Sequence, residues 1–485
     1  MTWKVRLSTP LTALLLTPLG TQAAVLEEVT VTAQKREQSL QDVGIAVTAL
    51  TGEQMQQLGF TNAQEVTALA PGVSTIQPNG PSNFAIAIRG VAQNDFVSNQ
   101  ESPVSVYVDE VYVSQMSAAG FLLFDMERVE ILRGPQGTLF GRNATGGLAH
   151  YVTRKPTEEF EGYAQVTGGS YDQVKFEGAV GGELSDGIMG RVSIATHHNE
   201  GYVDNRLLDK NLNNANDYAG RGQLLITPNE DFEMLLNVRG SLQQIRTGFF
   251  ENVSSRDLNG DGLGELTPGL ANFNGYRDGD GDVFAGDYDR FGFQDAWSIG
   301  GSSTIKWQVE DNLRFTSITD FQKVVRDYQE DSDASPIADF NFYLTTDAEQ
   351  FSQEFRLDGE MDRARWTAGF YFLDIKVEDS NGAEQPLLGV FGDLGLPAPL
   401  VDSPAGLLGP IENDGSFLGN DNPYTTKTTS WSVFGQLEYD LSEQFSAILG
   451  VRYINENKEH EYANNFVDFN NDGTTKRGGN PNILD

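Results

Sequence analysis

The chain has 485 residues, which is long enough for more than one domain and a large core. Its 33 Lys and Arg residues against 69 Asp and Glu residues give a formal net charge of −36, which argues against a nucleic-acid partner, because such a partner requires a basic face. The absence of cysteine excludes disulfides, thiolate metal sites and cysteine catalysis, while 52 glycines and 10% aromatic residues favour an ordered, turn-rich, all-β protein over a disordered acidic chain.

The first segment, residues 1–23, has the pattern of a secretory signal peptide. Lys4 and Arg6 precede a short apolar run over 11–19, and small residues follow at Thr21-Gln22-Ala23. An apolar run of about 18 residues, as a membrane-spanning helix requires, occurs nowhere in the sequence. We therefore expect an exported protein without a transmembrane helix.

Residues 24–50 contain one short β-prone stretch, Glu28-Val29-Thr30-Val31-Thr32. The neighbouring residues show no pattern that indicates packing, so we expect a flexible N-terminal segment that links residue 24 to the first domain. A free extended stretch of this kind can pair its backbone with an edge strand of a partner protein. An ordinary first strand is the alternative interpretation.

A small mixed α/β domain is predicted over residues 51–156. Two short helices are expected to begin at the capping boxes Thr51-x-x-Gln54 and Thr61-x-x-Gln64, and Pro71-Gly72 is expected to end the second. The strands are predicted from three alternating runs, at 84–91, 103–113 and 127–135.

The end of this domain contains an unusual stretch, EILRGPQGTLFGRNATGG, at residues 130–147. It holds five glycines and two arginines with no obvious carboxylate nearby. Glycine is favoured where the backbone turns tightly or packs closely against another surface. The stretch is therefore expected to lie against another part of the protein.

Residues 157–485 show repeated alternating segments of about ten residues. In 188–196, for example, Ile188, Val192 and Ile194 share one face while Arg191 and Ser193 share the other. About eleven such strands are expected. A soluble β-sandwich would also alternate in this way.

The connections between these strands favour a membrane barrel over a sandwich. Short connections such as ELSDG, TPNED and DLSEQ alternate with long ones near 197–217, 247–291, 327–347 and 379–427. Short periplasmic turns, long extracellular loops and aromatic residues near strand ends are typical of outer-membrane barrels. A barrel of about 22 strands has a lumen wide enough to need a plug, and the domain over 51–156 is the natural candidate.

With these features, the chain resembles the TonB-dependent outer-membrane receptor family. The matching motifs are EEVTVTA (27–33), APGV (70–73), IRGV (88–91), PVSVYVDEVYV (103–113) and EILRGPQGTLFGRNATGGLAHYVTRKP (130–156), with QEFRL (353–357) as a matching barrel strand. The resemblance implies a plug domain followed by a transmembrane β-barrel of the 22-stranded type.

The resemblance also implies roles for individual residues. Arg89 of the IRG motif and Arg133 of the LRGP motif match arginines that pair with barrel glutamates in this family, and Glu354 is a candidate partner, since a buried guanidinium needs a carboxylate. A solvated position for both arginines is the alternative. The remaining residues of the plug signature are Gly90, Gly134, Pro135, Gly141, Gly146 and Gly147.

The stretch at 28–32 resembles the family's TonB box. The resemblance implies that TonB, powered by a proton-driven complex of the inner membrane, pairs with it by strand addition. It also implies a Gram-negative outer-membrane location in contact with lipid, with the N-terminus in the periplasm, and an extracellular small-molecule ligand, with a metal chelate as the first choice.

Three acidic stretches in the predicted barrel resemble calcium loops, which place oxygen ligands at positions 1, 3 and 5. None is complete, because the stretch at 278–289 lacks the glycine and the other two lack the final acid. Structural calcium is therefore weighed against simple solvated turns, and no other cofactor is expected. The candidate ligands are Asp257, Asn259, Asp261, Asp278, Asp280, Asp282 and Asp289.

The expected function is TonB-dependent import of a scarce ligand, with an iron–siderophore complex as the first choice. Uptake of a carbohydrate, cobalamin or another organic nutrient, and a passive surface receptor or adhesin, are the alternatives. No hydrolase motif and no ATP-binding motif is found, so an enzyme is not expected.

The number of predicted strands leads to one more expectation. About eleven strands are half of a 22-stranded barrel, so we expect the C-terminal half to be missing, whether by truncation or by incomplete sequence. An open half-barrel would leave unpaired strand edges in lipid, so this chain alone is expected not to transport.

Overall fold

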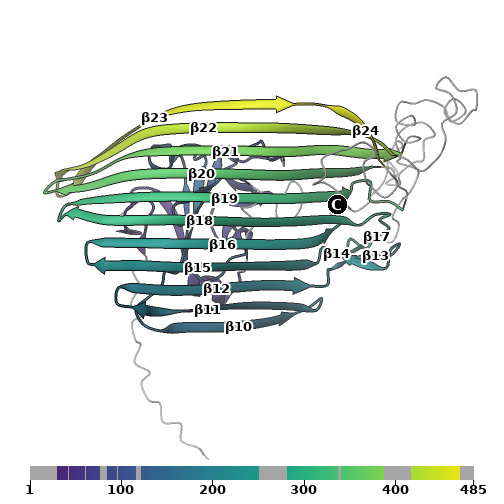
Figure 1. Ribbon diagram of the computed structural model, residues 1–485, viewed down its shortest axis with the longest axis horizontal. Helices are drawn as coiled ribbons and strands as arrows, with labels where there is room; N and C mark the ends of the chain where they lie inside the picture. Colours follow the sequence, from purple (N-terminus) through teal and green to yellow (C-terminus); the bar gives the residue numbers. More distant parts are fainter. Residues whose placement is uncertain are drawn as a thin grey trace, which may run out of the picture.

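The structure is a computed structural model that describes residues 30–41, 43–60, 62–76, 85–95, 97–115, 122–248, 250, 281–336, 340–386 and 417–469. The expected signal peptide at 1–23, together with Glu28 and Val29, lies outside these residues. In Figure 1 the chain forms a small domain, the plug, behind a large sheet of long strands.

The plug is built from short strands and helices around its own apolar core. Its five-stranded sheet has the order β3-β8-β9-β6-β7, and a separate hairpin pairs β4 with β5. The elements are β3 (Ala46–Thr51), α1 (Gly52–Leu58), α2 (Ala63–Thr67), β4 (Val73–Ile76), β5 (Ala85–Ile88), β6 (Val104–Val108), β7 (Val111–Val113), β8 (Met126–Arg133), α4 (Gly137–Phe140) and β9 (Gly147–Thr153).

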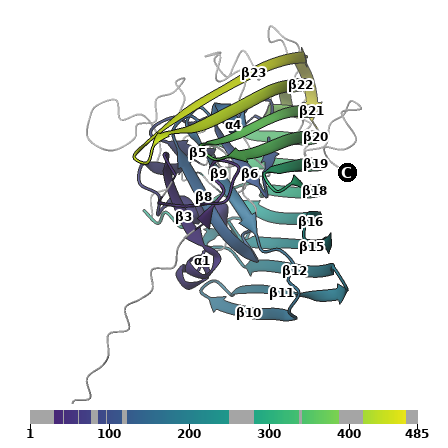
Figure 2. The same cartoon turned by 90° about the vertical axis from the view of Figure 1, so that its left-hand side faces the viewer.

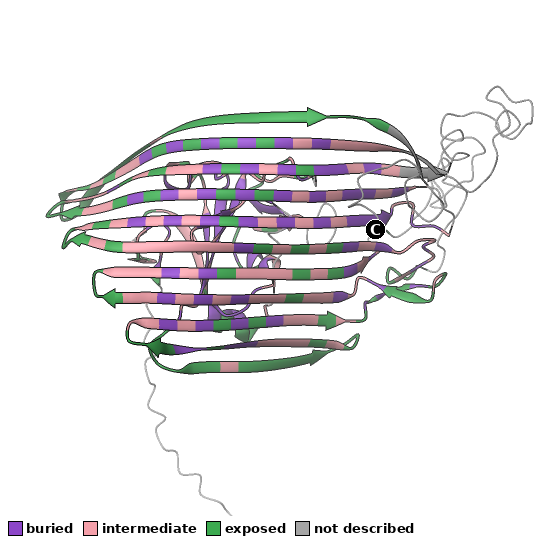
Figure 3. Cartoon of the chain, viewed as in Figure 1, coloured by how far each residue is buried: buried purple, intermediate pink, exposed green. Residues whose placement is uncertain are grey.

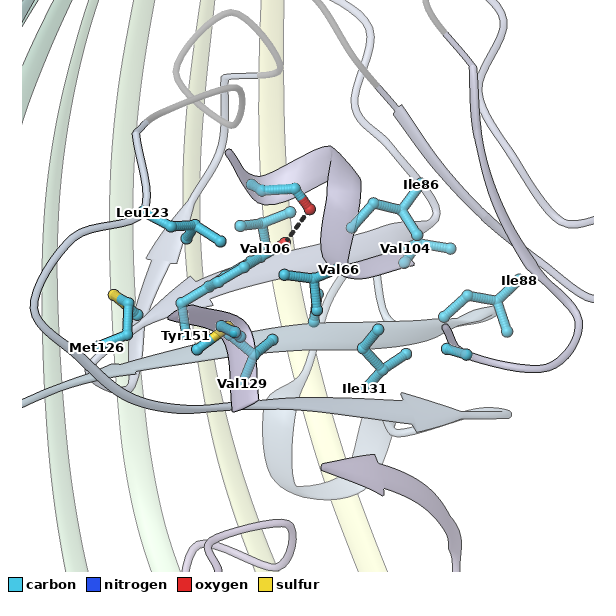
Figure 4. Packing of buried hydrophobic residues seen from close by; sticks show 14 residues of the cluster. Val66, Ile86, Ile88, Val104, Val106, Leu123, Met126, Val129, Ile131 and Tyr151 are labelled. Carbon is cyan, nitrogen blue, oxygen red and sulfur yellow. Dashed lines mark hydrogen bonds between the residues drawn. The ribbon is translucent and has the colours of Figure 1, made fainter. Parts of the chain in front are cut away.

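Burial of apolar side chains between the helices and the sheet stabilises the plug. Val66 on α2 packs with Ile131 on β8 and Ile88 on β5, all nearly inaccessible to solvent (Figure 4). The Tyr151 hydroxyl donates to the Ala63 carbonyl at 3.0 Å, which satisfies the one polar atom that this ring buries. The three predicted strand regions are confirmed, and β3 adds a strand from the segment expected to be a linker.

The two helix starts test the capping predictions. The Thr51 box is confirmed, because the Thr51 side chain accepts from the Gln54 amide and the Gln54 side chain accepts from the Thr51 amide. The second box is wrong by one residue, since Asn62 caps α2 and Glu65 completes the box. Asn62 can take the N-cap position in place of Thr61 because asparagine is at least as good an N-cap as threonine.

The large sheet is antiparallel, with neighbouring strands in the order β10-β11-β12-β15-β16-β18-β19-β20-β21-β22-β23, and β24 pairs with β22. Its strands are β10 (Glu161–Gly169), β11 (Gln173–Ser185), β12 (Ile188–Asn199), β15 (Ala215–Asn229), β16 (Phe232–Thr247), β18 (Gly292–Glu310), β19 (Leu313–Asp331), β20 (Asn341–Met361), β21 (Ala364–Pro386), β22 (Phe417–Ser442), β23 (Phe445–Tyr462) and β24 (Asn465–Phe469). A small sheet of β13 (Val203–Asn205), β14 (Lys210–Leu212) and β17 (Ala285–Gly286) lies among the long connections.

The two faces of the large sheet differ in polarity. On β12, Val192 and Ile194 are 55% and 48% exposed, whereas Arg191 is 2% exposed. A similar alternation of buried and more exposed residues runs along β19 and β20 in Figure 3. The exposed face is therefore apolar and the face toward the plug is polar, which is the pattern of a membrane barrel and the reverse of a soluble sandwich.

The plug lies on the concave side of the curved sheet (Figure 2). The fold is thus a plug domain with part of a barrel, as predicted, and eleven strands form the main path of the sheet. Among the described residues, no helix is long and apolar enough to cross a membrane.

Candidate functional site at the plug–barrel interface

A buried cluster of charged side chains joins the plug, the N-terminal segment and the barrel wall. Lys35 places its Nζ 2.7 Å and 2.5 Å from the two carboxylate oxygens of Glu354. Arg356 donates from Nη1 to Glu354 at 3.0 Å and to Glu110 at 2.8 Å, and from Nε to Asp358 at 3.1 Å. The Lys35, Glu354 and Arg356 side chains are each at most 5% exposed, so their charges are stable there only as partners of one another.

Three separate parts of the chain supply this cluster, which we call the ionic clamp (Lys35, Glu110, Glu354, Arg356 and Asp358). Lys35 lies in the turn between β1 (Thr30–Val31) and β2 (Gln38–Ser39), and Glu110 lies in the β6–β7 turn. Both turn residues have positive φ, at 57° and 65°. The other three members alternate along β20, where residues two apart project from the same face.

The clamp keeps the plug carboxylate ionised. Burial alone would raise the pKa of Glu110, but Arg356 and then Lys35 outweigh burial and lower that pKa from 4.5 to about 2. Glu110 therefore carries its negative charge at neutral pH, which keeps it attached to Arg356 on the wall.

The N-terminal segment is docked rather than free. Val31 has no exposed surface, and its neighbour Thr32 donates its backbone N–H to Glu130 on β8 at 2.8 Å. Arg36 also reaches the wall, where it lies 2.9 Å from Glu438 on β22. The expectation of a flexible segment is therefore wrong for Thr30, Val31 and Thr32, because an apolar side chain and a backbone donor there find buried partners on the plug.

Within the part of the chain that the structure describes, neither of the two arginines that the resemblance singles out pairs with the candidate Glu354. Arg133 donates from Nη1 to the Pro71 carbonyl at 3.1 Å, and Arg89 is exposed with φ at 52°. No ion pair of either with Glu354 occurs among the described residues, and Glu354 is paired instead with Lys35 and Arg356. Glu354 does face the plug side, but its cations come from the N-terminal turn and from its own strand.

The glycines of the signature serve different surfaces. A Cβ on Gly141 would lie 2.7 Å from the Arg452 guanidinium of β23, so Gly141 permits contact with the wall, as expected for this stretch. A Cβ on Gly146 would meet Val91 and Val104, and one on Gly147 would lie 2.2 Å from the Leu132 carbonyl, all within the plug. The remaining signature positions, which lie in or near turns, are Gly90 and Gly134 with φ at 80° and 108° and the exposed Pro135.

We expect Gly141→Ala to loosen this contact. Gly141 has φ at 82° and ψ at −132°, a conformation that costs a residue with a Cβ about 1–3 kcal/mol, and the new methyl would also displace Arg452 from the Leu139 carbonyl. Gly137→Ala is the matched control, because it lies in α4 with nothing within 4 Å of its Cβ position. Protease sensitivity of the plug should rise in the first variant only; an equal rise in both would contradict the close-packing role.

A second buried ion pair joins the plug to another part of the wall. Asp125 accepts from Arg191 Nε at 2.7 Å and Nη2 at 2.5 Å, and from Ser193 Oγ at 2.9 Å. Arg221 donates to the Asp125 carbonyl at 3.0 Å. The sequence assigned Arg191 and Ser193 to the polar face of their strand correctly, but it gave no sign that Asp125 would meet them.

A polar group lies farther along the lumen, toward the long connections. Ser98 of the plug lies 2.5 Å from Thr346 on β20, whose hydroxyl is 3.3 Å from Asp379 on β21. Arg326 is the register partner of Thr346 and is 1% exposed, with Nε and Nη1 lacking hydrogen-bond partners. Unsatisfied guanidinium N–H groups are suited to an anionic or oxygen-rich ligand.

The structure describes only part of the predicted calcium stretch. Asp257, Asn259, Asp261, Asp278 and Asp280 lie outside the described residues. Asp282 is exposed, with Oδ1 accepting from the Phe284 amide at 3.0 Å. Asp289 instead lies close to Asp331 at the end of β19 and to Asp333 in the turn that follows.

Parts of the chain are similar to known proteins. Residues 39–148 match the family model of the TonB-dependent receptor plug domain. The pesticin receptor of Yersinia enterocolitica is 31% identical over 165 residues, covering 33% of this chain and 24% of that protein. The vitamin B12 transporter of Vibrio vulnificus is 25% identical over 205 residues, covering 40% and 32%. The matched region thus spans less than a third of the length of either relative.

Solved structures match over more of the chain. The ferric yersiniabactin uptake receptor from Yersinia pestis superposes with a TM-score of 0.66 at 17% identity, covering 87% of this chain and 61% of that one. The ferripyoverdine receptor of the outer membrane of Pseudomonas aeruginosa, bound to ferripyoverdine, gives 0.65 at 14% identity, covering 91% and 56%. At these identities the likeness is one of fold.

Proposed function

We propose that the protein imports a scarce ligand across the Gram-negative outer membrane, because residues 39–148 match the plug-domain model of TonB-dependent receptors and the large sheet shares the fold of such a receptor. The N-terminus lies in the periplasm, where TonB pairs with residues 28–32 by strand addition. TonB then pulls on this segment, and the plug rearranges to open a path along the wall.

The observation that carries the proposal is the docking of the N-terminal segment into the ionic clamp. A pull on residues 28–32 acts first on the pairing of β1 with β2, then on the Thr32–Glu130 hydrogen bond and then on Lys35. Removal of Lys35 leaves Glu354 and Glu110 sharing Arg356 alone, which weakens the attachment of the β6–β7 turn to the wall. Force on a short segment is thereby converted into release of one side of the plug.

The proposed ligand is an iron–siderophore complex, with cobalamin as the second candidate. Matched proteins are named for ferric pyoverdine, ferric yersiniabactin and vitamin B12, which supports both. Arg326, with its unpartnered N–H groups in the lumen, supports an anionic metal chelate over a neutral sugar, because a guanidinium favours carboxylate and phenolate oxygens.

Deletion of residues 27–33 is expected to abolish uptake while surface binding persists, because the deletion removes the site of strand addition, whereas Ser98, Thr346 and Arg326 lie outside the deleted segment. Uptake and cell-surface binding of radiolabelled ferric pyoverdine, ferric yersiniabactin and cyanocobalamin should be measured in cells that lack other receptors. Normal uptake by the deletion strain would rule out the proposal.

Lys35→Met is the matched comparison, since it removes the clamp cation but keeps residues 27–33. This variant is expected to take up ligand through TonB, and to lose that uptake in cells without TonB. Uptake by Lys35→Met that is independent of TonB would show instead that the clamp alone keeps a passive channel closed.

A further inference from the structure

Three carboxylates converge where two of the long connections meet. Asp289 precedes β18, Asp331 ends β19, and Asp333 lies in the turn toward β20. One ligand atom from each lies within 4.8 Å of the others. They lie at the end of the sheet opposite the short turns that join β18 to β19 and β20 to β21.

The backbone around these acids is packed and hydrogen-bonded. The Asp289 amide donates to Asp331 Oδ2 and to the Ser335 carbonyl, both at 3.1 Å, and the Ala334 amide donates to Asp331 Oδ1 at 2.9 Å. Tyr288 and Ala334, next to these acids, share a small apolar core with the β13–β14 hairpin. The carboxylates are therefore held close together by the fold rather than meeting by chance on a mobile surface.

A fourth polar side chain points to a missing ligand. Asn341 is the register partner of Asp331 across the β19–β20 pair, so the two side chains project from the same face as neighbours. Asn341 is 1% exposed, yet neither its Oδ1 nor its Nδ2 has a hydrogen-bond partner. An amide buried in this way is unfavourable unless something else satisfies it.

The charges of these side chains also favour an added cation. Ligand atoms of three carboxylates lie within 4.8 Å of one another, and a divalent cation between them would relieve the repulsion of their like charges. Three acids and one amide oxygen form the hard oxygen-donor set that Ca²⁺ prefers.

We propose that Asp289, Asp331, Asp333 and Asn341 bind one calcium ion, which ties the connection before β18 to the turn between β19 and β20. The site differs from the loop arrangement expected over 278–289, because Asp289 is completed by residues more than forty positions later in the chain. It takes a divalent cation and is independent of the ligand that the receptor carries.

The test uses the protein purified from outer membranes in detergent, treated with EDTA and then titrated with calcium chloride. Trypsin cleavage after Arg290 reports opening of this connection. With Kd in the range of extracellular calcium modules, about 0.1–1 mM, cleavage is expected to slow about tenfold when free calcium is ten times Kd. Equilibrium dialysis should find one additional ion bound.

Asp331→Asn and Asn341→Ala are expected to lose this calcium protection, and Asp209→Asn, in the exposed β13–β14 turn, should keep it. In EDTA, Asp331→Asn should be cleaved no faster than the wild type, because the substitution relieves crowding of like charges. Protection that persists in Asp331→Asn, or that magnesium or sodium chloride of matched ionic strength reproduces, would overturn the assignment.

Discussion

Replacing Arg356 with Met should detach the plug from the β20 wall. The substitution preserves much of the side-chain volume but leaves Glu110, Glu354 and Asp358 with Lys35 as the one clamp cation. Removing one partner of a buried charge network costs about 3–5 kcal/mol, because the remaining charges stay desolvated. Hydrogen exchange of the β6–β7 turn and of residues 30–39 should accelerate strongly.

The control for Arg356 is Arg365→Met on the adjacent strand β21. Arg365 lies 2.7 Å from Glu438, but its side chain is 39% exposed, and exposed pairs contribute about 0–1 kcal/mol. Exchange of the plug should change little in this variant. Equal acceleration in both proteins would contradict a special role for the clamp.

The pH dependence gives an independent readout of the same substitution. In the wild type, Glu110 has a folded-state pKa lowered to about 2, so its contribution is complete above pH 4.5 and is lost as the pH falls from 4.5 toward 2. Without Arg356, burial dominates and the folded-state pKa of Glu110 should rise. Protonation of Glu110 then removes its unpaired buried charge. The loss of stability of Arg356→Met relative to the wild type should therefore shrink as the pH is lowered through this window.

The strands of the barrel could be predicted from the sequence because one chemical rule governs them. A strand between lipid and a polar lumen must alternate, so Val192 and Ile194 on one side and Arg191 on the other reveal the two faces. The lengths of the connections then distinguish the two ends of the sheet. These features are local, and local patterns are what a sequence displays directly.

The partners across the plug–wall interface could not be predicted in the same way. Lys35 and Glu354 are 319 positions apart, and their meeting depends on how the plug is rotated in the lumen. β1 and β2 have two residues each, too few for a periodic signal, so the docked segment resembled a flexible one. Arg133 drew attention through its motif, yet its Nη1 donates to the Pro71 carbonyl of the plug itself, and its Nε has no hydrogen-bond partner among the described residues.

Asp125→Asn should release the opposite side of the plug. Asp125 has φ at 51°, a left-handed conformation that asparagine tolerates, so the substitution removes the charge without straining the backbone. Arg191 and Arg221, whose side chains are 1% and 6% exposed, then lose their shared buried counter-charge. Arg191 keeps its ion pair with Glu161 at 2.6 Å. The expected loss of stability therefore lies toward the lower end of about 3–5 kcal/mol.

The measurement is hydrogen exchange of β8 and β9, which follow Asp125 in the plug, together with protease sensitivity at Arg154. Both should increase in Asp125→Asn, whereas Asp186→Asn, in the exposed β11–β12 turn, should behave like the wild type. Asp125 and the ionic clamp hold separate parts of the plug through residues that share no partner. The increases in hydrogen exchange and protease sensitivity caused by Asp125→Asn and Arg356→Met should therefore add when the two are combined. A double variant no looser than either single one would show that the plug is released as one unit and that neither contact is an independent anchor.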